Sequence, residues 1–377
     1  MDTEYKEIAI NLTKFNRKAL YKTVMAASMK ENDVILHFNS SNKKPEVSCI
    51  VIAFNASRFL KYALKSLLKQ DFEPKLEIFI SYDRGTTDNT LSVINEFIDK
   101  NRSIMPKFEL TLLFHNNTTL FRDRELSLRY ARGNAFCFLD YDNIYFSQKI
   151  SKQYAFMKSN KCHFLFSSQN VIDESGKIIK NRYLNVPPDY KDPNRLLLAN
   201  FIDANEIMFD RAFYLTTLKP AFDVVSDGLY NDIIEDYFIN SMAALSRNIN
   251  FLPETLGSYR FSRYSITPHQ SKLVFDSNSF TKSAKFYSRL QLTLFAITFV
   301  NSKLEFYGKD IRFNYVSLFS PKSKNLSFHF LGDFGVKSSE KLPIRLIHFG
   351  LSAVYAGIKV SAKYAKSRFF KFLFKMS

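Results

Sequence analysis

The sequence predicts an α/β fold in which a mostly parallel sheet is flanked by helices. Apolar, β-branched runs alternate with amphipathic segments from Glu46 onward, and polar turns follow the runs. This alternation is typical of βα units, whose strands are covered on both faces and whose ligands bind beyond the carboxyl ends of the strands. The chain has 377 residues and 46% apolar content, which is enough to bury the core of one large domain or two smaller ones.

Strands and helices are expected in strict alternation along this part of the chain. The run 47–54 is almost continuously apolar, as in a strand covered on both faces, and 59–70 places leucine and alanine on one face of a helix. The other expected strands are 76–81, 110–114 and 135–139, and the other expected helices are 89–100 and 125–132. Asp83 and Asp140 therefore fall at strand ends, where a ligand site is expected.

Two further regions flank this pattern. Residues 1–45 carry a helical apolar pattern around Leu20 and Val24 and end in a polar break, so we expect a helical extension. Residues 271–377 lose the βα rhythm and gain Lys, Phe and Ser. The sequence thus predicts a main domain at 46–270 between these two regions.

The last part of the chain, 343–377, is expected to form a basic amphipathic helix. Apolar residues recur at three-and-four spacing, lysine and arginine occupy the rest of the circumference, and no acid follows Glu340. Such a helix can lie in the headgroup layer of an anionic membrane. The alternative is a terminal helix that packs on its own domain.

A formal charge of +17 calls for a polyanionic neighbour, which can be nucleic acid, an anionic membrane or a phosphorylated substrate. No arginine-rich tract or zinc-finger spacing supports nucleic acid, and the 20 Tyr and 39 Phe are spread as core residues usually are. Cys49, Cys137 and Cys162 sit singly in apolar runs, which predicts small buried side chains and a reducing compartment. Without a secretory signal or an apolar run of about 18 residues, we expect a cytoplasmic protein, peripheral on the inner face of the membrane.

Two carboxylates one residue apart end the fourth expected strand, in Phe138-Leu139-Asp140-Tyr141-Asp142-Asn143. Residues i and i+2 of a strand project to the same side, so both side chains can reach one hard cation. That geometry suits Mg²⁺ or Mn²⁺ shared with a diphosphate. The alternative is a pair of solvated acids in a turn.

Four motifs in order resemble the inverting family 2 glycosyltransferases, which have the GT-A fold and use nucleotide-diphosphate sugars. The first strand, Val47 to Asn55, resembles Val-Ser-x-Ile-x-Pro-x-Tyr-Asn, and Asp83 to Thr90 resembles Asp-Asp-Gly-Ser-x-Asp-x-Thr. Arg124 with Ala131-Arg132-Gly133 matches the spacing of the family's Arg-Asn-x-Gly and Ala-x-Gly, and Asp140-Tyr141-Asp142 falls at its metal-binding Asp-x-Asp. The resemblance covers roughly residues 46–270.

The resemblance implies donor-binding roles for several of these residues. Asn55, next to Phe54, would cap the first helix near the nucleotide. Asp83 would accept hydrogen bonds from a uracil-type imide or the ribose, although an Asx-turn is the alternative. Arg124 would place a cation near the diphosphate or buttress Asp83, unless it is an ordinary surface arginine. Tyr141 is also expected near the donor, which is most simply a UDP-sugar.

In the same comparison Asp142 would bind the metal directly, and Asp140 would contact the ribose or a metal-bound water. His269 is a possible third ligand, although a loop histidine without a metal role is favoured. Arg260, in a region that resembles the end of the catalytic domain only loosely, could contact the diphosphate, as could Arg263.

An inverting transfer needs a base that takes the proton of the acceptor hydroxyl. The family places it in a Glu-Asp pair before a helix, which here is Glu235 and Asp236. The resemblance implies Asp236 as the base and Glu235 as its neighbour that positions acceptor or metal. Two acids at a helix start also suit a bare helix N-terminus.

Three residues depart from the family pattern and affect the details of nucleotide contact. Arg84 replaces the second acid of the Asp-Asp turn, Ser57 stands where many relatives have Glu, and Glu125 replaces the Asn after Arg124. The expected function is a metal-dependent inverting transfer of a sugar to a surface glycan or lipid-linked acceptor, in capsule, O-antigen or lipooligosaccharide assembly. The rivals are a nucleotidyltransferase, whose glycine-rich loop is missing here, and a non-catalytic basic protein that binds polyanions or membranes through a degenerate domain.

Overall fold

A computed structural model describes most of the first 262 residues. The described residues are 5–11, 17–30, 32–38, 44–103, 107–116, 119–182, 184–198, 200–225 and 233–262, with 293, 296, 297 and 300. They divide into two compact units, of which the first comprises the described parts of Met1–Pro188, Phe201–Lys219 and Asn248–Ser262. The second comprises the described parts of Asp189–Asn200, Pro220–Arg247 and Arg263–Ser377. The domain boundaries expected after residues 45 and 270 stay predictions.

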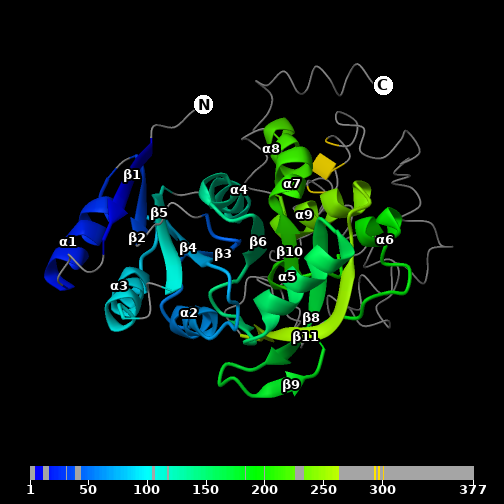
Figure 1. Ribbon diagram of the computed structural model, residues 1–377, viewed down its shortest axis with the longest axis horizontal. Coiled ribbons are helices and arrows are strands. Elements are labelled where there is room, and N and C mark those ends of the chain that lie inside the picture. The colour runs from blue at the N-terminus through cyan, green and yellow to red at the C-terminus, as the bar shows by residue number, and fades with distance from the viewer. Residues whose placement is uncertain are drawn as a thin grey trace, which may run out of the picture. The chain divides into compact units, whose positions relative to one another are not determined.

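One large sheet forms the centre of the first unit (Figure 1). Its strands are β1 (Tyr5–Ile10), β2 (Asp33–Phe38), β3 (Val47–Ala53), β4 (Leu76–Asp83), β5 (Phe108–His115), β6 (Ala135–Phe138), β7 (Ile144–Tyr145), β8 (Phe164–Ile172), β9 (Ile178–Lys180), β10 (Ile207–Asp210) and β11 (Phe251–Arg260). Their order is β1-β2-β5-β4-β3-β6-β10-β8-β11-β7, with β9 paired to β8. The helical elements of this unit are α1 (Arg17–Ser28), α2 (Leu60–Leu68), α3 (Thr90–Lys100), α4 (Leu120–Tyr130), α5 (Lys149–Asn160), η3 (Ala204–Glu206), α7 (Arg211–Phe213) and the π-helical η4 (Tyr214–Leu218).

The α/β fold class predicted from the sequence is confirmed. The four central strands β5, β4, β3 and β6 are mutually parallel, as the βα rhythm predicts. Beyond them β10 runs antiparallel to both β6 and β8, and β2 runs antiparallel to β5. The sheet is thus parallel where the candidate site lies and mixed on either side of it.

Burial explains why the predicted strands form. Every residue of β3 and β4 is buried, so these strands are covered on both faces, as continuous apolar runs require. Alternate residues of β3, including Cys49 and Val51, pack in one core cluster with Leu64 and Leu67 of α2. All three cysteines are buried and free, as their isolated positions in apolar runs indicate.

The helical extension expected at the N-terminus is only partly correct. The helix α1 is present, but β1 and β2 flank it, and β2 pairs along most of its length with β5. The apolar run Asp33–Phe38 is six residues long, which is too short to stand out beside a helical pattern, and it becomes a strand because it covers the edge of β5.

The second unit contains three helices among its described residues: α6 (Pro193–Leu198), most of α8 (Lys219–Val224) and α9 (Glu235–Leu245). No helix in the described ranges has the length and apolar character needed to cross a bilayer. The basic helix expected at 343–377, and His269 and Arg263, lie outside the described residues.

Candidate functional site

The predicted donor-binding residues gather at one edge of the sheet. Strands β4 and β6 pair in parallel with β3 on its two sides, so their carboxyl ends lie together. Asn55 follows β3, Asp83 ends β4, and Asp140 follows β6. Phe54 directly follows β3 and is 46% exposed, so its ring is accessible at the same edge. Adjacent parallel strands therefore bring three of the four motifs to one place, as the fold class predicts.

Asn55 does not cap the first helix, so this expectation is wrong. Helix α2 begins five residues later, at Leu60, and its N-cap residue makes no side-chain cap hydrogen bond. Asn55 has a positive φ of 47°, which asparagine tolerates better than most residues. Its Oδ1 accepts a hydrogen bond from the backbone N–H of Thr87 at 2.9 Å. Asn55 thus joins the loop after β3 to the loop after β4.

Asp88 and Asp83 shape the second of these loops. The Asp88 carboxylate accepts hydrogen bonds from the backbone N–H groups of Ser57, at 3.0 Å, and Thr90, at 2.9 Å. Partial burial raises the pKa of Asp88, but hydrogen bonds from the side chains and then the backbone N–H groups of Thr90 and Ser57 outweigh it, and the pKa is lowered. Asp83 is buried, and its Oδ1 accepts from the N–H of Gly85 at 2.7 Å, which is an Asx-turn. The alternative role foreseen for Asp83 is therefore present, and ligand contact stays a prediction.

Arg84 turns away from this edge and holds the N-terminal segment. Its Nη2 donates to the carbonyls of Ala27, at 3.2 Å, and Asn32, at 2.9 Å, and Nη1 donates to Asn116. Burial lowers its pKa, but neighbouring acids oppose that effect. Arg84 stands where the family has its second acid. In this chain the β1-α1-β2 segment supplies the backbone carbonyls that an arginine at this position can bind.

The Asp140 carboxylate is held from two sides. Arg124 is 1% exposed, stacks its guanidinium 4.4 Å above the Phe138 ring and donates from Nη2 to Asp140 Oδ1 at 2.9 Å. On the other side Asn205 Nδ2 donates to Asp140 Oδ2 at 2.7 Å, and Asn205 Oδ1 accepts from the Asp140 backbone N–H at 2.6 Å. Arg124 is therefore not a surface arginine, and the carboxylate that it buttresses is that of Asp140, while contact with Asp83 or the diphosphate stays a prediction.

Asn205 was not foreseen from the sequence. It lies in η3, 65 residues after Asp140, and Asp203 accepts hydrogen bonds from both its backbone and its side-chain amide. Asp203 and Glu206 form a capping box around η3, which orients the amide. The pattern Asp-x-x-Glu is the local signal for this cap, but nothing local indicates that the residue between them reaches Asp140.

A third carboxylate, Asp203, crowds the pair Asp140 and Asp142. Burial, followed by the charge of Asp140, raises the pKa of Asp142 to about 7, and Asp203 acts in the same direction. Burial and the neighbouring acids also raise the pKa of Tyr141 to about 12. A divalent cation would offset this crowding, and carboxylate oxygens are the ligands that Mg²⁺ and Mn²⁺ accept. The residues fit such an ion, with Asp142 and Asp140 as the ligands.

Among the described residues, protein groups do not complete a coordination shell by themselves. Within the described ranges no group of three or more His, Cys, Asp or Glu side chains is arranged to hold a metal ion. A two-carboxylate site is usual for Mg²⁺, which keeps waters and takes phosphate oxygens from its substrate. The donor diphosphate would therefore supply the remaining ligands.

Arg260 is buried and its described contacts are structural. Its Nε donates to the Asp142 carbonyl at 2.8 Å, its Nη1 donates to the carbonyls of Asp173 and Glu174, and its guanidinium lies 4.7 Å from the Phe59 ring. These bonds fix the backbone beside the metal pair. Contact with the diphosphate stays a prediction.

The Ala131–Gly133 part of the remaining motif lies at the start of β3, away from the candidate site, whereas Arg124 reaches Asp140. A Cβ at Gly133 would stand 2.5 Å from the Ser48 backbone nitrogen, and the Gly133 N–H donates to Ser48 Oγ at 2.7 Å. The Ala-x-Gly motif thus lets a loop approach the start of β3 and is structural. Glu125 is buried between Arg122 and Arg129, whose guanidinium groups balance its charge.

The proposed base lies in the second unit. Glu235 and Asp236 occupy the first turn of α9, where acids suit the helix dipole. Asp236 Oδ1 accepts from the N–H of Tyr237 at 2.6 Å, and Glu235 is buried. Their catalytic roles stay predictions.

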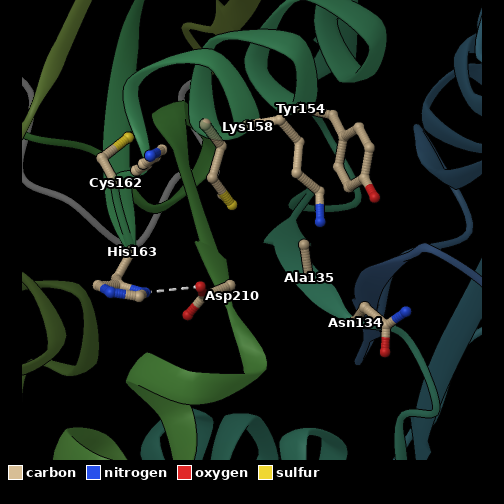
Figure 2. A pocket seen from close by; sticks show the side chains of 9 residues that line it. Asn134, Ala135, Tyr154, Lys158, Cys162, His163 and Asp210 are labelled. Carbon is tan, nitrogen blue, oxygen red and sulfur yellow. Dashed lines mark hydrogen bonds and ion pairs between the residues drawn. The ribbon is translucent and has the colours of Figure 1, made fainter.

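A cavity of about 280 Å³ opens at the amino ends of β6 and β8 (Figure 2). His163 and Asp210 pair across it at 2.7 Å, and Lys158, Tyr154 and Asn134 also line it. Ligands of such sheets bind beyond the carboxyl ends of the strands, so this cavity is not the donor site.

Comparisons with known proteins identify the class of this domain. The sequence profile described as glycosyl transferase family 2 matches residues 48–217. Residues 48–217 therefore form a family 2 glycosyltransferase domain.

Among its relatives is the Escherichia coli UDP-Glc:alpha-D-GlcNAc-diphosphoundecaprenol beta-1,3-glucosyltransferase WfgD, 26% identical over 60% of this chain and 81% of that protein. An uncharacterized Haemophilus influenzae glycosyltransferase is 29% identical over 36% of this chain, which spans 52% of that protein's length. The crystal structure of S. aureus TarS 1–349 in complex with UDP-GlcNAc aligns with a TM-score of 0.43 at 18% identity, over 85% of this chain and 89% of that one.

Proposed function

We propose that the protein is an inverting, metal-dependent glycosyltransferase that moves a sugar from a UDP-sugar to a surface-glycan or lipid-linked acceptor. The observation that carries this proposal is the clamped Asp140 beside Asp142, at the carboxyl edge of parallel strands in a family 2 domain. The printed names of two relatives, WfgD and the Bacillus subtilis teichuronic acid glycosyltransferase TuaG, support a UDP-sugar donor and a cell-surface product.

In this proposal each group at the edge has one task. Asp83 and the loop after β3 would bind the nucleoside, and Asp142 with Asp140 would hold Mn²⁺ or Mg²⁺. The bound ion would neutralise charge on the departing nucleoside diphosphate. Arg124 and Asn205 fix the Asp140 oxygens, which would keep the site organised when the donor is absent.

Asp236 would take the proton of the acceptor hydroxyl as that oxygen attacks the anomeric carbon opposite the leaving group, which inverts the configuration. Glu235 would position the acceptor or the metal. Asp236→Asn should abolish transfer while donor binding persists, because the amide removes the base and keeps the side-chain shape. A full transfer rate in Asp236→Asn would exclude this role.

The test measures release of nucleoside diphosphate from a panel of nucleotide sugars with Mn²⁺. We expect release from one donor in the wild type, loss of release with chelator, and loss in Asp142→Ala. The matched control is Glu96→Ala, which removes an exposed carboxylate on α3 and should leave the rate unchanged. Silence across the panel, with no nucleotide binding by calorimetry, would favour the rival proposal of a non-catalytic polyanion-binding or membrane-binding protein.

The proposed location is the inner face of the membrane, where lipid-linked acceptors are built, with 343–377 as the anchor. A variant truncated after residue 342 should sediment more weakly with anionic vesicles while keeping donor hydrolysis. Unchanged sedimentation of this variant would remove the anchor role from that segment.

A further inference from the structure

The β8–β9 hairpin ends in an exposed tip that combines apolar and basic side chains. All residues from 175 to 182 are exposed, and Ile178 and Ile179 retain 53% and 54% of their accessible surface. Strand β9 pairs with Val171 and Ile172 of β8, so the tip is folded back on the sheet. Two adjacent isoleucines exposed in this way are unusual for a surface that meets only water.

The charge around these isoleucines has one sign. Lys177, Lys180 and Arg182 flank them, and no acid occurs from residue 175 to residue 188. The two acids at the start of the hairpin turn, Asp173 and Glu174, are engaged within the protein. Asp173 accepts hydrogen bonds from the turn amides of Ser175 and Lys177, and Glu174 pairs with Arg58 at 2.6 Å.

We propose that this tip, residues 175–182, inserts into the headgroup layer of an anionic lipid bilayer. Successive side chains of a strand point to opposite faces, so Ile178 and Ile179 project on both sides of the hairpin. A flat protein partner would cover one side only, whereas lipid surrounds an inserted tip on both. The cations then lie at the depth of anionic headgroups, which attract them.

The tip is connected to the candidate site through one side chain. Arg260 donates to the carbonyls of Asp173 and Glu174, which begin the turn of the hairpin, and to the backbone carbonyl of Asp142 at the candidate site. An inserted tip would therefore hold the metal loop close to the bilayer surface. The benefit of holding the metal loop at the bilayer rests on the proposed function, because a lipid-linked acceptor presents its reactive end at the bilayer surface. Insertion of the tip itself does not depend on catalysis.

The chain contains no tryptophan, so a single introduced one reports on its own surroundings. The experiment uses full-length Ile178→Trp with vesicles of phosphatidylcholine alone or mixed with phosphatidylglycerol, some carrying brominated acyl chains. The matched control is Leu215→Trp, at a residue of η4 that is 51% exposed and outside the hairpin. Because the signal is local, it is independent of binding by other parts of the chain.

For Ile178→Trp with phosphatidylglycerol vesicles, we expect the indole fluorescence to shift to the blue and to be quenched by brominated acyl chains. For Leu215→Trp we expect neither change. Adding Lys177→Gln and Lys180→Gln should raise the concentration of phosphatidylglycerol vesicles at half-maximal blue shift, by about fivefold for each cation removed. If vesicles bind the Ile178→Trp protein without shifting or quenching the introduced indole, the proposal is overturned. A blue shift that grows with protein concentration in the absence of lipid would also overturn it, because that result identifies a second copy of the chain as the occupant.

Failure of this inference is separable from failure of the proposed function. Insertion is measured again with Asp142→Ala in the Ile178→Trp background, where quenching should persist. Donor hydrolysis is measured without vesicles, where Ile178→Trp should match the wild type. Absence of donor hydrolysis in the wild type would count against the proposed glycosyltransferase function. Absence of quenching alone would count against insertion of the tip into the bilayer.

Discussion

Replacing Asn205 by alanine should weaken metal binding at the candidate site more than it weakens the fold. The substitution removes the Nδ2 donor to Asp140 Oδ2 at 2.7 Å and the Oδ1 acceptor of the Asp140 N–H at 2.6 Å. The first bond is to a charged group and contributes about 1.5–3 kcal/mol, whereas the second joins neutral groups and contributes about 0.5–1.5 kcal/mol. Asp140 is 31% exposed and water can replace part of the loss, so we expect about 1.5–3 kcal/mol in total, or roughly 10- to 150-fold in Mn²⁺ affinity.

The assay is UDP release as a function of Mn²⁺ concentration, with thermal unfolding measured in parallel. Asn205→Ala should raise the half-saturating Mn²⁺ concentration by the stated factor. Asn205→Asp is the sharper variant, because it keeps the shape but places a carboxylate against Asp140 and Asp203, and its defect should be larger. An unchanged Mn²⁺ dependence in both variants would refute the role of Asn205 in holding the Asp140 carboxylate for the metal. A loss of activity that unfolding explains wholly would show that Asn205 has only a structural role.

Three further predictions concern the rest of the first unit. Gly133→Ala should lower the urea midpoint by an amount equivalent to about 1–3 kcal/mol, because its Cβ would meet the Ser48 backbone nitrogen at 2.5 Å; an unchanged midpoint would contradict this packing. Arg84→Ala should speed proteolysis near Asn32 and raise the KM for donor severalfold, because the β1-α1-β2 segment and the Asp83 turn lose their common anchor; identical cleavage patterns would argue against it. Burial lowers the pKa of Lys149 from 10.5 to about 8, so the unfolded chain holds more protons between these values. The unfolding free energy should therefore rise with pH from 8 to 10.5, by up to about 3 kcal/mol relative to Lys149→Met, and parallel pH profiles for the two proteins would exclude the effect.

The sequence predicted the central strands well because their environment is simple. Strands β3 and β4 are buried on both faces, and the amphipathic helices beside them repeat every 3.6 residues, so periodicity alone locates them. The outer strands could not be found in this way. Strand β1 is mostly exposed, and β10 is four residues long and enters the sheet between β6 and β8 from far along the chain. Their places depend on tertiary pairing.

In the candidate site, too, residues with a local sequence signal were predicted and residues placed by long-range contacts were not. Asp140 and Asp142 were predictable because both chemistry and spacing are local. Asn205 was not, because its partner is 65 residues away and its own segment signals only a cap. Arg260 is the reverse case, because its motif position suggested a ligand contact, which stays a prediction, whereas its hydrogen bonds to backbone carbonyls have no local signal in the sequence.

The pairing of β2 with β5 has a practical consequence for anyone who shortens this chain. The segment matched by the family profile, 48–217, excludes both β2 and β11. An expression product cut to those limits would bare one edge of β5, whose eight residues are all buried, and would remove the parallel neighbour of β8. Bare edges of apolar strands recruit other chains, so such a product should collect in inclusion bodies. The segment to express must keep these outer strands, so it begins before Tyr5 and extends beyond Ser262.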